Sequence, residues 1–275
     1  MTQRSILITG ASTGIGLATA RALKARGWRV LVTARKPADI DRLSTQEKLE
    51  VLPLELTDES CVAACAEEAL RRTDGKLTAL YNNAAYGVVG AMEDISAAVL
   101  RRHFEANVIG THELTRRLIP AMRKAGGGRI VFCSSVLGFV SGPYRGAYCG
   151  TKYAIEALAD AMRVELWGSG IHVSIIQPGP IETEFLPTTL ANFKRDIDVE
   201  HSPHRFAYEK RMADMARGQP SIFKLGPEAV AAKVVHAVES PRPRIRYRVT
   251  LSTHAAAVLK RVLPARVLDQ IVAKW

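Results

Sequence analysis

The chain has 275 residues, of which 47% are hydrophobic and 24% charged, as in ordinary globular proteins. This composition excludes disordered, collagen-like and fibrous chains, and no apolar run approaches the ~20 residues that span a bilayer. The N-terminus lacks the basic segment followed by an apolar stretch that would predict a secretory signal. The four cysteines lack the spacing of zinc ligands. We therefore expect reduced thiols, no metal site and a cytoplasmic protein.

The net charge of +11 is concentrated near the C-terminus. After Pro241, eight basic side chains stand against one acid, Asp269. The first 240 residues are close to balanced and show no basic surface interleaved with aromatic residues. We therefore expect no nucleic-acid partner.

Short apolar segments alternate with longer helical patterns through the first 240 residues. The apolar segments predict strands at 5–9, 29–34, 49–54, 77–81, 129–133 and 173–177. The helical patterns cover 14–26, 58–71, 96–124 and 148–167. Most strands are apolar on both faces, as in parallel sheets covered by helices. Residues 1–240 therefore predict an α/β fold: one doubly wound Rossmann domain with a mostly parallel sheet of about seven strands and helices on both faces.

Two segments depart from this alternation. Residues 180–226 lack a strand pattern and are long for a connection, so they predict a substrate-side insert with short helices. After Pro241, arginines alternate with Ile245, Tyr247 and Val249, which predicts an edge strand with one solvated face. Amphipathic helical sequence follows, divided by Pro264. Residues 241–275 therefore predict an edge strand and a basic amphipathic C-terminal extension.

A glycine-rich turn follows the first strand and opens the first helix. It contains Gly10, Ser12, Thr13, Gly14, Ile15 and Gly16. Glycines let backbone N–H groups approach a pyrophosphate, and the helix N-terminus adds a favourable dipole. The strand–turn–helix context therefore predicts a dinucleotide site.

The end of the second strand bears on which dinucleotide binds. Sites that prefer NAD usually carry an acid here for the ribose hydroxyls, and Ala34 offers none. Arg35 follows and can bind a 2′-phosphate through charge-assisted hydrogen bonds. The sequence favours NADP(H), with NAD(H) as the alternative.

Tyr148 and Lys152 stand one helical turn apart and share a helix face. A nearby cation favours the phenolate, which allows a tyrosine to act in acid–base catalysis. Ser135 closes the fifth strand, thirteen residues before Tyr148, where it can hydrogen-bond a substrate carbonyl.

Taken together, these segments resemble the short-chain dehydrogenase/reductase family over about residues 4–240. Residues 9–16 fit its TGxxxGxG turn, 82–85 its NNAG segment with Ala85 in place of glycine, and 178–183 its PGxxxT stretch. Ser135, Tyr148 and Lys152 fit its catalytic set. The second strand and the longer tail are similar to the 17β-hydroxysteroid and retinol dehydrogenase-like branch.

The resemblance implies further site residues. Asn107 occupies the place of the family's fourth catalytic residue, and Asn83 and Thr183 lie in segments that contact the cofactor. Glu55 stands where the family has an aspartate that contacts adenine. Thr13 stands where many NADP-dependent members carry a basic residue.

The implied reaction is hydride transfer between NADP(H) and a carbonyl or alcohol carbon. In reduction, Tyr148 would donate a proton, Lys152 would hold the nicotinamide ribose, Ser135 would orient the carbonyl, and Asn107 would support a relay water. The alternatives are a 3-ketoacyl thioester reductase and a non-catalytic NADP(H)-sensing binding protein.

Apolar residues of the insert point to a lipophilic substrate: a steroid, a retinoid, or a long-chain aldehyde or ketone. They are Phe185, Leu186, Leu190, Phe193, Phe206, Met212 and Met215. The alternative is that they only pack short helices onto the sheet. The C-terminal extension could pack on the protein itself, join an oligomer contact, or lie peripherally on an anionic membrane. The family resemblance implies a homo-dimer or homo-tetramer.

Overall fold

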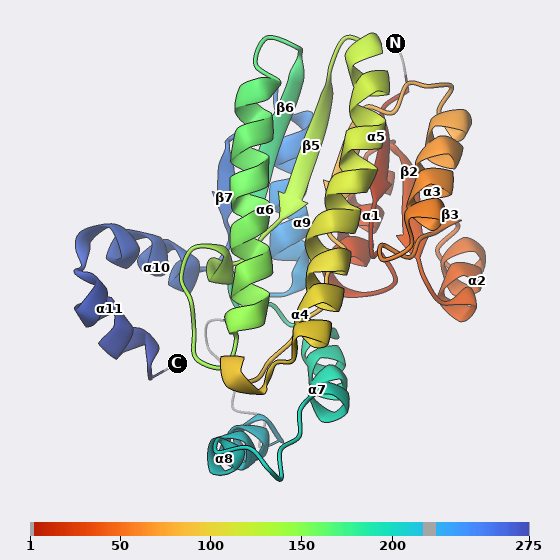
Figure 1. The fold of residues 1–275 in the computed structure, drawn as a ribbon. Coiled ribbons are helices and arrows are strands. Elements are labelled where there is room, and N and C mark those ends of the chain that lie inside the picture. Colours follow the sequence, from red (N-terminus) through yellow and green to blue (C-terminus); the bar gives the residue numbers. More distant parts are fainter. Residues whose placement is uncertain (1–2, 217–223, 275) are drawn as a thin grey trace.

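Seven strands form one parallel sheet at the centre of the protein (Figure 1). The structure, a computed structural model, describes residues 3–216 and 224–274. The sheet order is β3-β2-β1-β4-β5-β6-β7, and every neighbouring pair is parallel. The strands are β1 (Ser5–Ile8), β2 (Arg29–Ala34), β3 (Glu50–Pro53), β4 (Ala79–Asn82), β5 (Gly128–Cys133), β6 (Ile171–Gln177) and β7 (Arg246–Arg248). The predicted doubly wound Rossmann fold is therefore confirmed.

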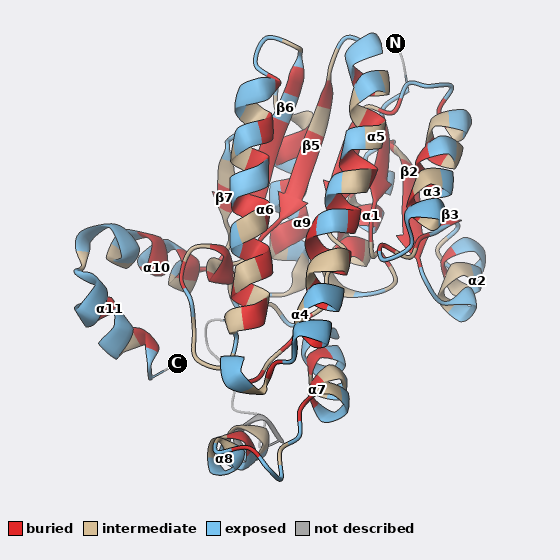
Figure 2. Ribbon diagram, in the orientation of Figure 1, coloured by how far each residue is buried: buried red, intermediate tan, exposed pale blue. Residues whose placement is uncertain are grey.

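Helices cover both faces of the sheet because the strand side chains are apolar on both sides (Figure 2). One face packs against α3 (Glu59–Arg72), α5 (Gly110–Lys124) and α6 (Gly146–Glu165). The other face packs against α1 (Gly14–Lys24), α2 (Pro37–Thr45) and α9 (Pro227–Glu239). Neighbouring residues of β1 point to opposite layers: Leu7 lies in the first, and Ile6 and Ile8 lie in the second.

The predicted long helix at 96–124 is interrupted. It consists of α4 (Ala97–Phe104), a π-helical turn η2 (Glu105–Ile109) and α5. Ser96 caps its start by accepting a hydrogen bond from the Val99 amide at 3.3 Å. At Gly110, a Cβ would lie 2.0 Å from the Leu56 carbonyl oxygen, so only glycine permits this close approach. Such π-helical turns are common at functional sites, and this one contains Asn107.

In the described part of the insert after β6, the chain forms two helices, in agreement with the short helices that were predicted. They are α7 (Phe185–Asp196) and α8 (Arg205–Ala216). Phe193 and Tyr208 pack edge to face, with ring centroids 5.1 Å apart. These helices share a small apolar cluster with the segment after β4, which includes Val88 and Ile95. The insert is therefore held beside the carboxyl ends of the strands, where ligands of doubly wound sheets bind.

The C-terminal extension begins with β7 at the sheet edge and continues as α10 (Leu251–Val262) and α11 (Ala265–Val272). The edge position and the division at Pro264 were predicted. We predicted that the arginines of β7 lie on a solvated face, and this is wrong at Arg246, because its guanidinium pairs with Glu156 of α6 at 3.0 Å. Leu268 and Val272 are buried, so one face of α11 packs on the protein itself. In the described part of the chain, no helix has the length and apolar character needed to cross a membrane.

Candidate active site

The glycine-rich turn between β1 and α1 is packed too closely to accommodate side chains at its glycines. Gly10 and Gly14 have φ angles of +64° and +56°, a region that glycine adopts readily. A Cβ on Gly16 would lie 2.5 Å from the Gly10 carbonyl oxygen. Thr13 caps α1 without a side-chain hydrogen bond, and Ile15 packs against the core. The turn therefore presents backbone N–H groups at a helix N-terminus, an arrangement that fits a dinucleotide pyrophosphate.

Asn83 braces this turn from the end of β4. Its side-chain amide donates hydrogen bonds to the carbonyls of Thr9 at 3.1 Å and Gly10 at 3.0 Å. In return, the Thr9 hydroxyl accepts from the backbone amides of Asn83 and Ala84, each at 2.9 Å. The predicted cofactor residue Asn83 therefore fixes the shape of the cradle.

Two predicted residues at the strand ends meet in an ion pair. The Arg35 guanidinium donates to the Glu55 carboxylate at 3.3 Å, and 69% of the Arg35 side chain is exposed. The same carboxylate accepts from the hydroxyl of Thr57 at 2.9 Å. Arg35 is thus accessible to a ligand phosphate, with an acid beside it.

A second guanidinium near this region was not predicted from the sequence. Arg42 of α2 donates to the Ser12 carbonyl at 2.6 Å and to the Asp39 carboxylate at 3.1 Å. The spacing of Asp39 and Arg42, three residues apart, could have predicted that they pair on one face of a helix. The segment was, however, not predicted to be helical. Ser12, a predicted cofactor residue, is therefore held through its main chain.

The segment after β6 closes over the glycine turn. A Cβ on Gly14 would lie 3.1 Å from the side chain of Thr183. The Thr183 hydroxyl accepts a hydrogen bond from the Phe185 amide at 3.3 Å and so begins the turn into α7. The PGxxxT segment therefore joins the cofactor cradle to the insert.

Tyr148 and Lys152 lie on one face of α6, as predicted. The Lys152 ammonium lies 5.6 Å from the centroid of the Tyr148 ring and donates to the Cys133 carbonyl at 2.7 Å. Lys152 is only 3% exposed, and burial lowers its pKa. The strand end at Cys133 therefore holds the ammonium beside the phenol.

Ser135 lies at the end of β5, where it caps the short helix η3 (Val136–Gly138) by accepting from the Leu137 amide at 3.1 Å. Its hydroxyl lies close enough to Tyr148 to lower the pKa of the phenol. Burial has the larger effect and raises that pKa above its ordinary value. We expected the Lys152 cation to favour the phenolate, whereas in this structure burial dominates. The phenol keeps its proton at neutral pH, as a proton donor requires.

Asn107 is buried in the π-helical turn and paired with the backbone of Tyr86. Its amide oxygen accepts from the Tyr86 N–H at 3.2 Å, and its amide nitrogen donates to the Tyr86 carbonyl at 3.0 Å. The same nitrogen lies 3.4 Å from the Thr151 hydroxyl, beside Lys152 on α6. Asn107 therefore joins the segment after β4 to α6.

His103 was missed in the sequence analysis, although it precedes Asn107 by one helical turn. It is fully buried, and its Nε2 lies 2.8 Å from the Asn107 amide nitrogen and 2.9 Å from the Tyr86 carbonyl. Its ring stacks toward Tyr148, with centroids 6.2 Å apart. Burial, with a smaller contribution from the Lys152 cation, lowers the pKa of His103 to about 4, although the hydrogen bond to Tyr86 acts in the opposite direction.

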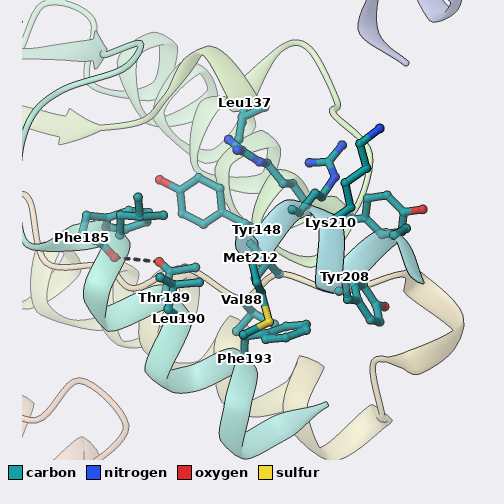
Figure 3. A pocket seen from close by; sticks show the side chains of 18 of the residues that line it. Val88, Leu137, Tyr148, Phe185, Thr189, Leu190, Phe193, Tyr208, Lys210 and Met212 are labelled. Carbon is teal, nitrogen blue, oxygen red and sulfur yellow. Dashed lines mark hydrogen bonds between the residues drawn. The ribbon is translucent and has the colours of Figure 1, made fainter. Parts of the chain in front are cut away.

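A cavity of about 530 Å³ opens beside Tyr148 (Figure 3). Most of the predicted apolar lining is confirmed: Phe185, Leu186, Leu190, Phe193 and Met212. The Phe185 ring lies 5.5 Å from that of Tyr148. Phe206 is wrong as a lining residue, since it is 79% exposed, and the Met215 side chain lies outside the described residues. The phenol of Tyr148 therefore borders a cavity with a largely apolar lining.

Comparisons with known proteins agree with this geometry. A sequence profile described as short chain dehydrogenase matches residues 4–192. The chain is 45% identical over 270 residues to the Escherichia coli K12 protein "Uncharacterized oxidoreductase YbbO", covering 98% of this chain and 94% of that protein. It is 31% identical over 267 residues to 17-beta-hydroxysteroid dehydrogenase type 1 from Homo sapiens, covering 91% and 78%. A solved short-chain dehydrogenase from Streptomyces avermitilis aligns with a TM-score of 0.79 and 29% identity, over 98% of this chain and 94% of that one. This protein therefore belongs to the short-chain dehydrogenase family of oxidoreductases.

Proposed function

We propose that the protein is an NADP(H)-dependent oxidoreductase that interconverts the carbonyl and alcohol forms of a lipophilic substrate. One observation carries this proposal: Tyr148, Ser135 and Lys152 converge, and Tyr148 lies in the wall of an apolar cavity. Steroids, retinoids and long-chain aldehydes or ketones have the apolar surface that such a cavity buries.

Each residue has a role that follows from its contacts. When bound, the nicotinamide supplies or accepts the hydride. Tyr148 donates a proton to the forming alkoxide, and the hydroxyl of Ser135 orients the carbonyl oxygen. Lys152 places a positive charge beside the phenol, which stabilises the phenolate left after proton transfer. Asn107 fixes the backbone of Tyr86 next to these groups and supports a relay water.

The preference for NADP(H) over NAD(H) is part of the proposal. Ala34 ends β2 without an acid, Arg35 is exposed beside it, and Arg42 lies at the glycine turn. Two guanidinium groups favour a 2′-phosphate, whereas Glu55 opposes it. Titration of the purified protein with NADPH and NADH tests this directly, and tighter binding of NADH would contradict it.

A carbonyl panel with each nicotinamide tests the reaction itself. Steroid and retinoid carbonyls, long-chain aldehydes and 3-ketoacyl thioesters are supplied separately, and nicotinamide oxidation is followed optically. We expect reduction of at least one lipophilic class. Faster reduction of ketoacyl thioesters would favour the alternative reductase, and cofactor binding without turnover would favour a sensing protein.

We also propose peripheral contact of the C-terminal extension with an anionic lipid surface. Leu251, Val258 and Val262 of α10 are 72%, 58% and 66% exposed, and Lys260 and Arg261 lie beside them. Exposed apolar residues flanked by basic side chains favour such surfaces. Co-sedimentation with phosphatidylserine vesicles should decrease in Val258→Asp, and equal binding by this variant would exclude α10 as the contact.

A homo-dimer or homo-tetramer is a further proposal. Val164 near the end of α6 and Trp167 in the turn after it are 62% and 85% exposed, which is unusual for large apolar side chains. Light scattering on the purified chain should give a multiple of its 30.0 kDa mass. A monomer at assay concentration would contradict this proposal.

A further inference from the structure

The cavity beside Tyr148 has an apolar floor and a basic rim. The rim residues in its lining are Arg145, Lys210, Arg211 and Lys274. They come from the start of α6, from α8 and from the end of the C-terminal extension. Among the lining residues that the structure describes, none is acidic. Since separate parts of the fold bring these cations to one opening, the rim is more than the solvated face of a single helix.

Two acidic side chains near the cavity, Asp94 and Glu93, are engaged with partners other than the rim cations. Asp94 accepts hydrogen bonds from Ser202 at 2.6 Å and from Tyr208. Glu93 pairs with His204 at 2.5 Å. Within the described ranges, neither rim lysine takes part in an ion pair with these or other acids. The charge of the lysines is therefore available at the opening.

The two rim arginines lie close enough to repel each other. Burial lowers the pKa of Arg145, and the charge of Arg211 lowers it further. Arg211 also lies over the Tyr144 ring, 4.8 Å from its centroid. Arg145 precedes Tyr148 by one helical turn, so part of the rim faces the reacting end of the cavity. The rim therefore brings two guanidinium groups to the cavity opening.

We propose that the substrate carries an anionic group, joined by an apolar chain to the carbonyl that Tyr148 protonates. This inference rests on the proposed function, because it assumes carbonyl chemistry at Tyr148. The apolar chain lies against Phe185 and Phe193, and the anion accepts charge-assisted hydrogen bonds at the rim. A carboxylate on an oxo acid and the phosphates of a coenzyme A thioester share this chemistry. An uncharged steroid or retinoid would leave the rim unused.

Two matched substrate pairs test the inference in the full-length protein with NADPH. The first is a long-chain aldehyde with a terminal carboxylate and its methyl ester. The second is a 3-oxoacyl-coenzyme A and the uncharged N-acetylcysteamine thioester. We expect kcat/KM to favour the charged member of one pair by about tenfold or more, as hydrogen bonds to charged groups allow. The pair that shows the preference identifies the source of the anion.

Substitutions at the rim locate the effect. In the double variant Lys210→Gln, Lys274→Gln, the ratio of charged to uncharged kcat/KM should fall about tenfold. Lys194→Gln is the control for the loss of a lysine charge elsewhere: it changes an exposed position on α7 outside the cavity lining, and it should keep the ratio. High salt should raise KM for the charged substrates alone.

The outcomes separate this inference from the proposed function. If uncharged carbonyls are reduced but the ratio stays near one in every protein, the inference is wrong and the proposed function stands. If the lysine substitutions reduce binding to anionic vesicles and leave the ratio unchanged, the rim binds lipid and the inference is again wrong. If no carbonyl is reduced with either nicotinamide, the proposed function fails, and the inference fails with it.

Discussion

The buried imidazole of His103 should make the protein sensitive to acid. Burial lowers its pKa from 6.5 to about 4, so between these pH values the unfolded state binds more protons than the folded state. Stability must therefore fall as pH decreases through this window, whereas at pH 7 the group is largely neutral in both states. A difference of one pKa unit corresponds to about 1.4 kcal/mol, so the cost is about 3 kcal/mol at pH 4.

The variant His103→Gln isolates this cost, because glutamine does not titrate and its side-chain oxygen can still accept from the Asn107 amide. Urea unfolding at a series of pH values should show that the wild type loses about 3 kcal/mol more stability between pH 7 and pH 4 than the variant. His112→Gln, at an exposed position on α5, is the control and should behave as the wild type. Equal losses in wild type and His103→Gln would refute the reasoning.

Other substitutions test the cradle, the cofactor preference and the sheet edge. Gly16→Ala should abolish NADPH binding measured by calorimetry, because its Cβ would lie 2.5 Å from a carbonyl oxygen of the same turn; unchanged affinity would contradict the cradle. Arg35→Ala should raise KM for NADPH about tenfold and leave KM for NADH unchanged. Equal increases in both KM values would exclude a contact with the 2′-phosphate. Arg246→Ala should cost about 2 kcal/mol in urea unfolding, because it leaves the buried Glu156 without its ion pair. The ion pair of Arg205 with Glu209 is exposed, so Arg205→Ala should cost less than about 1 kcal/mol. Equal losses of stability in Arg246→Ala and Arg205→Ala would be evidence against burial as the cause.

Much of the fold could be predicted because the strands are apolar on both faces and alternate with helices. The helices α2 and α9 were not predicted. The α2 segment is short and begins at a proline, and α9 follows the insert with a run of alanine and valine that has no strong polar face. Tertiary packing against the sheet, rather than local pattern, defines both helices.

The candidate site could be predicted at the positions where a motif specifies spacing. Tyr148 and Lys152 share a helix face by geometry alone, and the structure brings Ser135 to the phenol. Contacts between distant segments could not be predicted in this way. The brace that His103 provides to Asn107 depends on a π-helical turn, and no simple periodicity predicts such a turn. The pKa of the phenol likewise depends on burial, which the local pattern does not contain.

Turnover by Tyr148→Phe tests the central claim most directly. The substitution removes only the hydroxyl, so NADPH binding should survive while kcat with a lipophilic carbonyl falls by at least about a hundredfold. Tyr153→Phe, on the same helix but outside the cavity lining, should keep full activity. If Tyr148→Phe turns over the substrate as fast as the wild type, the phenol is not the proton donor and the proposed reaction is contradicted.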